Sequence, residues 1–227
     1  MTSDRSVVAD SLGVGAATGA YGLSFGALAT GAGLDVWQAC VLSLAVFTGA
    51  SQFAFIGVVA SGGNPLTGAL TALLLGSRNM FYGLSLAPLL RLTGPARLAS
   101  AHLVIDESTA MAVTRESTRQ ARLGFYWTGA SIFVLWNLTT FLGALAGTAI
   151  GDPRDYGLDA AVGAAFLGLL WPRLTSWGAR AIALLAGAVA LGLVPFTAAG
   201  VPIIVGGFVA VLVGLLRHVR PPEEELV

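Results

Sequence analysis

Arg78 stands out in this chain because it lies near the middle of an otherwise apolar run, residues 66–90. That run exceeds the ~20 apolar residues that a helix needs to cross a bilayer. An arginine at the bilayer centre costs from ~2.5 to more than ~10 kcal/mol. It therefore needs a partner, water or an anionic substrate, and we treat Arg78 as a candidate binding residue for a substrate carboxylate. The alternative is an arginine held by backbone carbonyls for packing alone.

Polar residues recur at helical spacing around this arginine. Successive members are separated by four, seven, four and three residues, so a helix places them on one face. The members are Thr67, Thr71, Arg78, Tyr82 and Ser85. Such a stripe favours a lined cavity, in which Tyr82 would close or shape the site.

Other apolar runs also carry isolated polar residues. A glutamine in lipid must find hydrogen-bond partners, so the polar face of F-T-G-A-S-Q-F at residues 47–53 should look into a helix bundle. Ser51 and Gln52 of this motif are candidate substrate contacts, and so are Asn137 and Ser24. The motif around Ser24, Y-G-L-S-F-G, also permits a broken helix near residues 24–26.

Asp106 and Glu107 are candidate coupling or gating residues, because a carboxylate here could carry a coupling proton or gate the cytoplasmic mouth. The surrounding segment, residues 98–113, is helical in pattern but short and charged for a span. It could span, lie at the membrane interface or re-enter the membrane. His102 and Asp106 are four residues apart, which favours a helical ion pair over a metal or proton-relay pair.

The composition places these residues in a membrane protein. Of 227 residues, 56% are hydrophobic and 11% charged, and the mean hydropathy is +0.80. Soluble domains carry about 25% charged residues, so we expect an all-α integral membrane protein surrounded by lipid. The net charge of zero gives no basic field for nucleic acid. With two histidines and one cysteine, Cys40, we expect no metal site, no cofactor and no internal disulfide.

We expect one transmembrane domain, residues 1–227, built as a polytopic bundle of about seven glycine-rich spans. The expected spans are 10–31, 38–60, 66–90, 125–150, 158–174, 177–194 and 201–216. Residues 25–35 resemble residues 141–152, which suggests inverted repeat halves at 10–91 and 123–196, joined by a linker at 92–122. Because both segments are rich in glycine and alanine, chance similarity is the alternative.

Arginine placement predicts the orientation in the membrane. With seven spans, one side receives only Arg5 and Arg154. The other side receives Arg91, Arg97, Arg115, Arg119, Arg122, Arg173, Arg180, Arg217 and Arg220. This asymmetry predicts an outside N-terminus and a cytoplasmic C-terminus. A further span at 98–113 would move the N-terminus inside.

Several motifs in order resemble the AzlC family, the larger subunit of branched-chain amino acid exporters. They are Y-G-L-S-F-G-A-L at 21–28, F-T-G-A-S-Q-F at 47–53, R-N-M-F-Y-G-L-S-L-A-P-L-L at 78–90, D-E at 106–107 and G-L-D-A-A-V-G-A-A-F at 157–166. One departure is Asn79, where the family pattern commonly has histidine, which leaves substrate detail and any proton role there open. The resemblance implies export of branched-chain or similar apolar amino acids across a bacterial inner membrane, with a small AzlD-type membrane partner.

Three other classes of function compete with an exporter. A non-transporting membrane scaffold would pair Arg78 structurally with Asp106 or Glu107. A channel for small solutes would need no carrier cycle. An intramembrane enzyme would need a nucleophile–base set or metal ligands, and the chain has neither an HExxH nor a G-x-S-x-G motif. We therefore expect no enzymatic activity.

Overall fold

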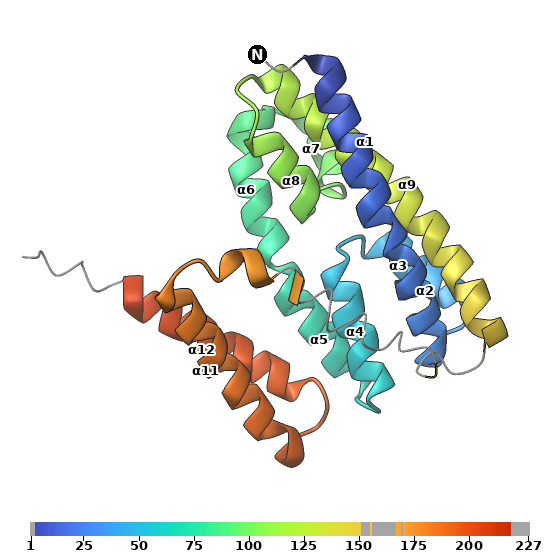
Figure 1. The fold of residues 1–227 in the computed structure, drawn as a ribbon, viewed down its shortest axis with the longest axis vertical. Helices are drawn as coiled ribbons and strands as arrows, with labels where there is room; N and C mark the ends of the chain where they lie inside the picture. Colours follow the sequence, from blue (N-terminus) through green and yellow to red (C-terminus); the bar gives the residue numbers. More distant parts are fainter. Residues whose placement is uncertain (1–2, 151–154, 156–166, 169, 219–227) are drawn as a thin grey trace, which may run out of the picture.

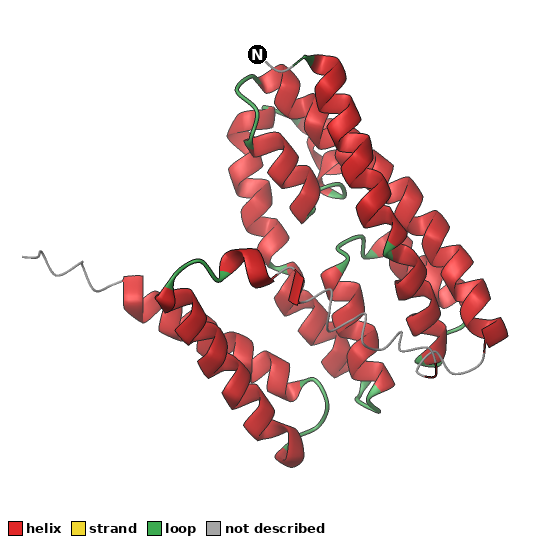
Figure 2. Cartoon of the chain, in the orientation of Figure 1, coloured by secondary structure: helices red, strands yellow, loops and turns green. Residues whose placement is uncertain are grey.

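The computed structural model describes residues 3–150, 155, 167–168 and 170–218, and this part of the chain is helical, without strands (Figures 1 and 2). The first eight helices are α1 (Asp4–Ala20), α2 (Gly22–Gly31), α3 (Val36–Ala45), α4 (Ala50–Ala60), α5 (Pro65–Gly76), α6 (Arg78–Leu90), α7 (Gly94–Ala101) and α8 (Asp106–Val113). They are followed by α9 (Thr118–Ile150), the 3₁₀ turn η2 (Trp171–Arg173), α11 (Trp177–Leu193), the 3₁₀ turn η3 (Val194–Phe196) and α12 (Val201–His218).

Among the residues that the structure describes, three segments are long and apolar enough to cross a membrane: Asp4–Gly31, Thr118–Ala149 and Trp177–Phe196. The first of them combines α1 and α2, because Tyr21 between them keeps right-handed helical angles. Shorter apolar helices accompany these three segments. The described residues thus confirm the helical membrane architecture. The count of seven spans stays a prediction, and the expected span at 158–174 lies mostly outside the described residues, as does the motif at 157–166.

Residues 38–60 form a hairpin of two half-length helices instead of the single span that we expected. α3 ends at Ala45, the chain turns through residues 46–49, and α4 runs back, so that both helices lie in the lower half of Figure 1. Gly49, the last residue of the turn, has a φ of +61°, which glycine tolerates better than other residues. The continuous apolar pattern did not reveal this break.

A second hairpin, α7 and α8, enters from the opposite end. α7 begins next to the end of α6, and α8 ends shortly before the start of α9 in the upper half of Figure 1. The segment at 98–113 therefore turns back at residues 102–105. His102 and Asp106 lie on either side of this turn, so the expected pair on one helix face is wrong. The His102 ring instead packs against Phe47, and its Nε2 lies 2.9 Å from the Leu44 carbonyl oxygen.

The N-terminus lies at the arginine-rich end of the molecule. Arg119 forms an ion pair with Asp4 at 2.6 Å, and Arg122 Nε donates to the Leu90 carbonyl oxygen at 2.8 Å. The expected separation of the N-terminus from these arginines is therefore wrong. Because residues 38–60 turn back, the chain passes along the molecule twice before Arg91, through α1–α2 and α5–α6, and not three times.

The glycines of the first span let it lie directly against α9. A Cβ at Gly26 would collide with the backbone of Thr140 and Ala144, and one at Gly143 would collide with the backbone of Leu23. Small residues thus bring the two helix backbones into close contact. The break that the motif at 21–26 permits near residues 24–26 does not occur, since α2 runs unbroken through them.

The α2–α9 contact also brings together the two similar segments, residues 25–35 and 141–152. Each supplies small residues to the same helix–helix contact, which is a packing reason for their likeness. The repeat halves themselves stay a prediction.

Candidate functional site

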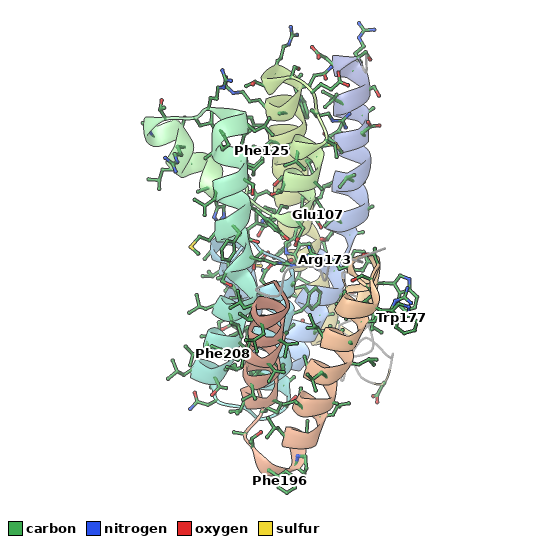
Figure 3. All side chains as sticks on the ribbon, turned by 90° about the vertical axis from the view of Figure 1, so that its left-hand side faces the viewer. Glu107, Phe125, Arg173, Trp177, Phe196 and Phe208 are labelled. Carbon is green, nitrogen blue, oxygen red and sulfur yellow. The ribbon has the colours of Figure 1, made fainter. Side chains whose placement is uncertain are left out.

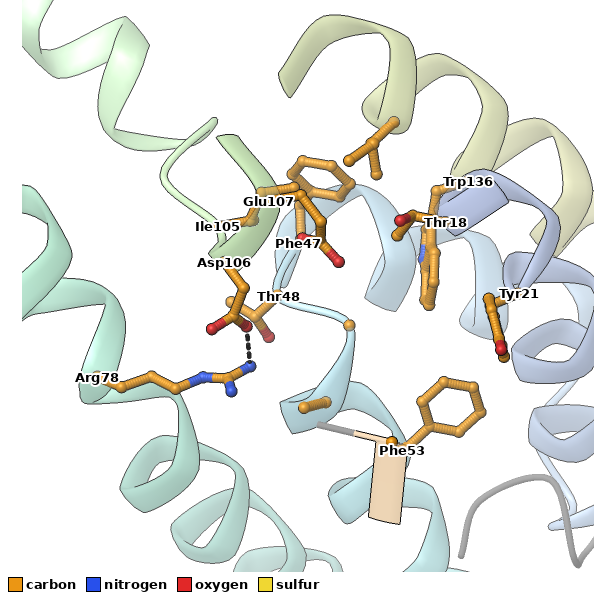
Figure 4. Close-up of a pocket in the computed structure, with 14 residues that line it drawn as sticks. Thr18, Tyr21, Phe47, Thr48, Phe53, Arg78, Ile105, Asp106, Glu107 and Trp136 are labelled. Atoms are coloured by element: carbon orange, nitrogen blue, oxygen red, sulfur yellow. Dashed lines mark ion pairs between the residues drawn. The ribbon is translucent and has the colours of Figure 1, made fainter. Parts of the chain in front are cut away.

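The two hairpin tips meet near mid-height and enclose a cavity of about 310 Å³ (Figure 4). This volume falls within the ~300–1,000 Å³ typical of small-molecule sites. Helices α1, α4, α6, α8 and α9 all contribute to its walls. The lining residues are Thr18, Tyr21, Phe47, Thr48, Gly49, Ala50, Phe53, Arg78, Ile105, Asp106, Glu107, Ile132, Trp136 and Gly168.

Both tips present a helix N-terminus to this cavity, and both N-termini are capped in the same way. The Gly49 N–H donates to Gln52 Oε1 at 3.1 Å, and the Ile105 N–H donates to Ser108 Oγ at 3.1 Å. In each case the side chain of the third helical residue accepts a hydrogen bond from the backbone N–H of the residue that precedes the helix. The first amides of a helix lack intrahelical acceptors and carry partial positive charge. α4 and α8 therefore each direct positive backbone potential at the cavity.

Asp106 is the centre of a charged cluster beside the cavity. Arg78 Nη2 lies 2.6 Å from Asp106 Oδ2, and the Tyr82 hydroxyl donates to Oδ1 at 2.7 Å. Arg173 Nη2 approaches Oδ1 at 3.3 Å and donates to the Tyr82 hydroxyl at 3.0 Å. The cluster therefore ties the tip of α8 to α6 and to η2. Figure 3 shows Arg173 near the middle of the molecule, close to Glu107.

Glu107 differs from its neighbour in its partners. In the part of the chain that the structure describes, no arginine or histidine forms an ion pair with it. Its side chain extends into the cavity toward Thr18 and Trp136, away from Arg78 (Figure 4). The two carboxylates of α8 thus face different surroundings.

The remaining wall is largely aromatic. Phe25, Phe53 and Trp136 pack together, with ring centroids 5.7 to 6.2 Å apart, and Phe47 lies against Phe133 at 5.1 Å. Trp136 is only 4% exposed, and its indole nitrogen has no hydrogen-bond partner among the described residues. This wall suits an apolar group, with one indole donor left free.

Four of the predicted site residues come together here. Arg78, Asp106 and Glu107 line the cavity, and Tyr82 bonds directly to Asp106. Thr48, from the predicted polar face, also lines the cavity.

The other four predicted residues lie outside the cavity lining. Ser51 is buried toward Gly76 of α5, while Gln52 caps its own helix. Asn137 Nδ2 donates to the Phe133 carbonyl oxygen at 2.7 Å within α9, and Ser24 lies on α2.

The sequence analysis missed two components of the site. It used Arg173 only to predict orientation. This arginine follows the sequence W-P at the end of an apolar run, and its position there could have suggested that it needs an acidic partner. It also left Phe47, Phe53 and Trp136 unassigned, although two of them flank the polar residues of one motif.

Among the described residues, no group of three or more His, Cys, Asp or Glu side chains could hold a metal.

Comparison with known proteins gives two matches. The model of one protein family, described as AzlC protein, matches residues 13–150. An uncharacterized membrane protein of Archaeoglobus fulgidus is 34% identical over 170 residues, which cover 74% of this chain and 74% of the relative. No solved structure matches the chain significantly.

Proposed function

Because this chain belongs to the AzlC family of membrane proteins, we propose that it is a secondary transporter subunit. In this proposal it exports branched-chain or similar apolar amino acids across a bacterial inner membrane, together with a small AzlD-type subunit. Its C-terminus is cytoplasmic in this proposal, and it catalyses no chemical reaction. The observation that carries the proposal is the cavity between the two hairpin tips, which joins a charged end to an aromatic wall.

An apolar amino acid needs three kinds of contact. Its carboxylate needs a cation or helix N-terminus, its ammonium needs oxygen acceptors, and its side chain needs an apolar wall. Arg78 and the α4 N-terminus suit the first of these, and Phe47, Phe53 and Trp136 suit the last. The cavity therefore offers matched surroundings for both ends of such a molecule.

Asp106 links occupancy of the cavity to the arrangement of the helices. Its carboxylate lies 2.6 Å from Arg78, where a substrate carboxylate would bind. A substrate must therefore share Arg78 with Asp106 or displace it. Displacement would loosen the connection between the α8 tip and α6, which is the kind of differential contact that alternating access requires.

A structural role for Arg78 is the second candidate, and the short ion pair with Asp106 favours it. In a non-transporting scaffold, this pair would hold α6 against the α8 tip and bind nothing else. Arg173 also contacts Asp106, so the carboxylate would keep one arginine if Arg78 were removed.

The test replaces Arg78 and measures export of labelled leucine, valine and isoleucine from loaded vesicles, with and without the small partner subunit. Arg78→Lys keeps the charge and loses the planar pair of donors. We expect export to fall by about tenfold or more, because a hydrogen bond to a charged group contributes ~1.5–3 kcal/mol. Arg78→Leu should reach the membrane in normal amount and export nothing.

Membrane-embedded yield, measured beside export, separates the alternatives. Full export by Arg78→Leu would remove Arg78 from the substrate site. A drop in yield for Arg78→Leu, with full export retained by Arg78→Lys, would support the scaffold role. Absence of counter-flow in the wild-type protein, with solute flux still present, would indicate a channel.

A further inference from the structure

Asp106 and Glu107 are adjacent carboxylates in the first turn of α8, and they have opposite surroundings. Both oxygens of Asp106 are occupied by Arg78, Tyr82 and Arg173. No cation forms an ion pair with Glu107 in the described part of the chain. Asp106 is therefore already neutralised, while Glu107 is available to an incoming charge.

Glu107 lies where a ligand would reach it. Its side chain enters the cavity, with Thr18 and Trp136 across from it (Figure 4). An ionised carboxylate removed from water is costly unless a cation or several donors compensate it. The helix N-terminus and nearby donors supply part of this compensation. A cationic group in the cavity would supply the rest.

The wall next to Glu107 gives an independent reason to expect a cationic group. Trp136, across the cavity from Glu107, presents its ring to the cavity, and a cation over such a ring gains ~0.5–2 kcal/mol. Trp136 is 4% exposed, yet its indole nitrogen has no partner among the described residues. Because an indole N–H can only donate, this buried donor indicates an acceptor oxygen in a bound ligand, such as a carboxylate oxygen, and not the cationic group itself.

We propose that Glu107 binds the ammonium group of the transported amino acid, while Arg78 binds its carboxylate. This assignment rests on the proposed function and deepens it, because it makes the cavity specific for zwitterions. Asp106 and Arg78 are the charged groups nearest to Glu107, and they neutralise each other through their ion pair. The ammonium therefore meets one carboxylate that has no ion-pair partner among the described residues, and this contact fixes the direction in which the substrate lies.

The test compares three ligands that differ only at their charged ends. L-Leucine has both ends, 4-methylpentanoate keeps the carboxylate and lacks the ammonium, and L-leucinamide keeps the ammonium and lacks the carboxylate. Each competes with labelled leucine for the full-length protein in membrane vesicles that also contain the partner subunit. 4-Methylpentanoate binding is measured directly with labelled compound.

Glu107→Gln should weaken leucine and leucinamide binding by about tenfold or more, because it removes a charge-assisted contact. It should leave 4-methylpentanoate binding unchanged. Asp106→Asn is the matched control, since it removes the neighbouring carboxylate. It should change leucine and 4-methylpentanoate binding by similar factors, because both ligands use Arg78.

Three outcomes would count against the assignment. If Glu107→Gln binds leucine with the affinity of the wild-type protein, the assignment of Glu107 is wrong and the proposed function still stands. Equal losses for leucine and 4-methylpentanoate would show that Glu107 acts through the fold. Absence of leucine binding by the wild-type protein would overturn the proposed function and this inference with it. If Glu107→Gln does not reach the membrane, Glu107→Asp carries the same test, with a loss confined to ligands that have the ammonium.

Discussion

The tips of the two hairpins are alike in backbone design and differ in charge. Each is a turn between two half-length helices, and each begins its second helix with a side-chain acceptor three residues after the cap, Gln52 in α4 and Ser108 in α8. The first turn of α8 contains Asp106 and Glu107, whereas the first turn of α4 contains no acidic residue.

This difference shows how one backbone arrangement can serve two ends of a ligand. A helix N-terminus favours a negative charge by ~0.3–1 kcal/mol in exposed cases. At α8 the chain supplies that charge itself, and the resulting carboxylates can attract cations. At α4 the chain supplies none, so the N-terminus stays available to an anion. The two tips thus give the cavity an anionic and a cationic side.

The largest expected effect comes from removing the charge that distinguishes the α8 tip. Asp106→Asn leaves Arg78 and Arg173 without their shared carboxylate. Because the Arg78 and Asp106 side chains are 21% and 19% exposed, we expect a loss of about 2–4 kcal/mol, below the ~3–5 kcal/mol of a fully buried pair. Thermal unfolding of the purified protein in micelles measures it.

Arg173→Gln is the control for this prediction. The Arg173 side chain is 60% exposed and contacts Asp106 at 3.3 Å, so its removal should cost no more than ~1 kcal/mol. Equal losses for Asp106→Asn and Arg173→Gln would contradict the view that Asp106 is the centre of the cluster.

A smaller loss of stability is expected from a change in the contact between α2 and α9. In Gly26→Ala the new methyl group would meet the Thr140 carbonyl oxygen and, at 2.6 Å, the Ala144 nitrogen. α2 and α9 must then separate, which should cost about 1–3 kcal/mol. Gly13→Ala is the matched control, because a Cβ there has no neighbour within 4 Å.

Folded yield and the thermal unfolding midpoint compare the two alanine variants. Gly13→Ala should unfold at or slightly above the wild-type temperature, since alanine favours a helix by ~0.5–1 kcal/mol over glycine. Equal destabilisation by both would show that the α2–α9 contact is looser than the structure indicates.

The smallest effect tests whether the two tips are capped alike. Gln52→Met and Ser108→Ala each remove the acceptor for the cap N–H, and each should cost ~0.5–2 kcal/mol. Ser108→Ala should cost more, because Ser108 Oγ also donates to the Leu103 carbonyl oxygen at 2.6 Å. Normal stability with lost leucine binding in Gln52→Met would instead place Gln52 in contact with the substrate.

The sequence predicted the charged half of the cavity better than its shape. An arginine and two carboxylates in apolar surroundings need partners, and this physical requirement led to Arg78, Asp106 and Glu107. Gln52 and Asn137 meet this requirement locally for one atom each, because Gln52 Oε1 accepts from the Gly49 N–H and Asn137 Nδ2 donates to the Phe133 carbonyl oxygen. Gln52 Nε2 and Asn137 Oδ1 have no partner among the described residues. Sequence alone does not tell whether a polar side chain finds its partner nearby or across the bundle.

The turns at the hairpin tips could not be read from hydrophobicity. Residues 38–60 are apolar on both sides of the break, so the pattern is that of one span. The local signal is Gly49, whose positive φ only the backbone reveals. The same error placed the N-terminus at the wrong end. A hairpin counted as a full span adds one pass along the molecule, and each added pass moves the preceding chain to the opposite end.

The place of α9 has a consequence for synthesis of the protein. Ile132 and Trp136 of α9 cover the first tip, yet the ribosome makes that tip before it reaches residue 118. At roughly 5–20 residues per second, the intervening chain takes several seconds to appear. During that time α3 and α4 are each too short to cross the bilayer, and the side of the first tip that faces α9 stays open. We therefore expect the first hairpin to need shelter during insertion until α9 arrives, and a nascent chain arrested before α9 to be more sensitive to proteases than the complete chain.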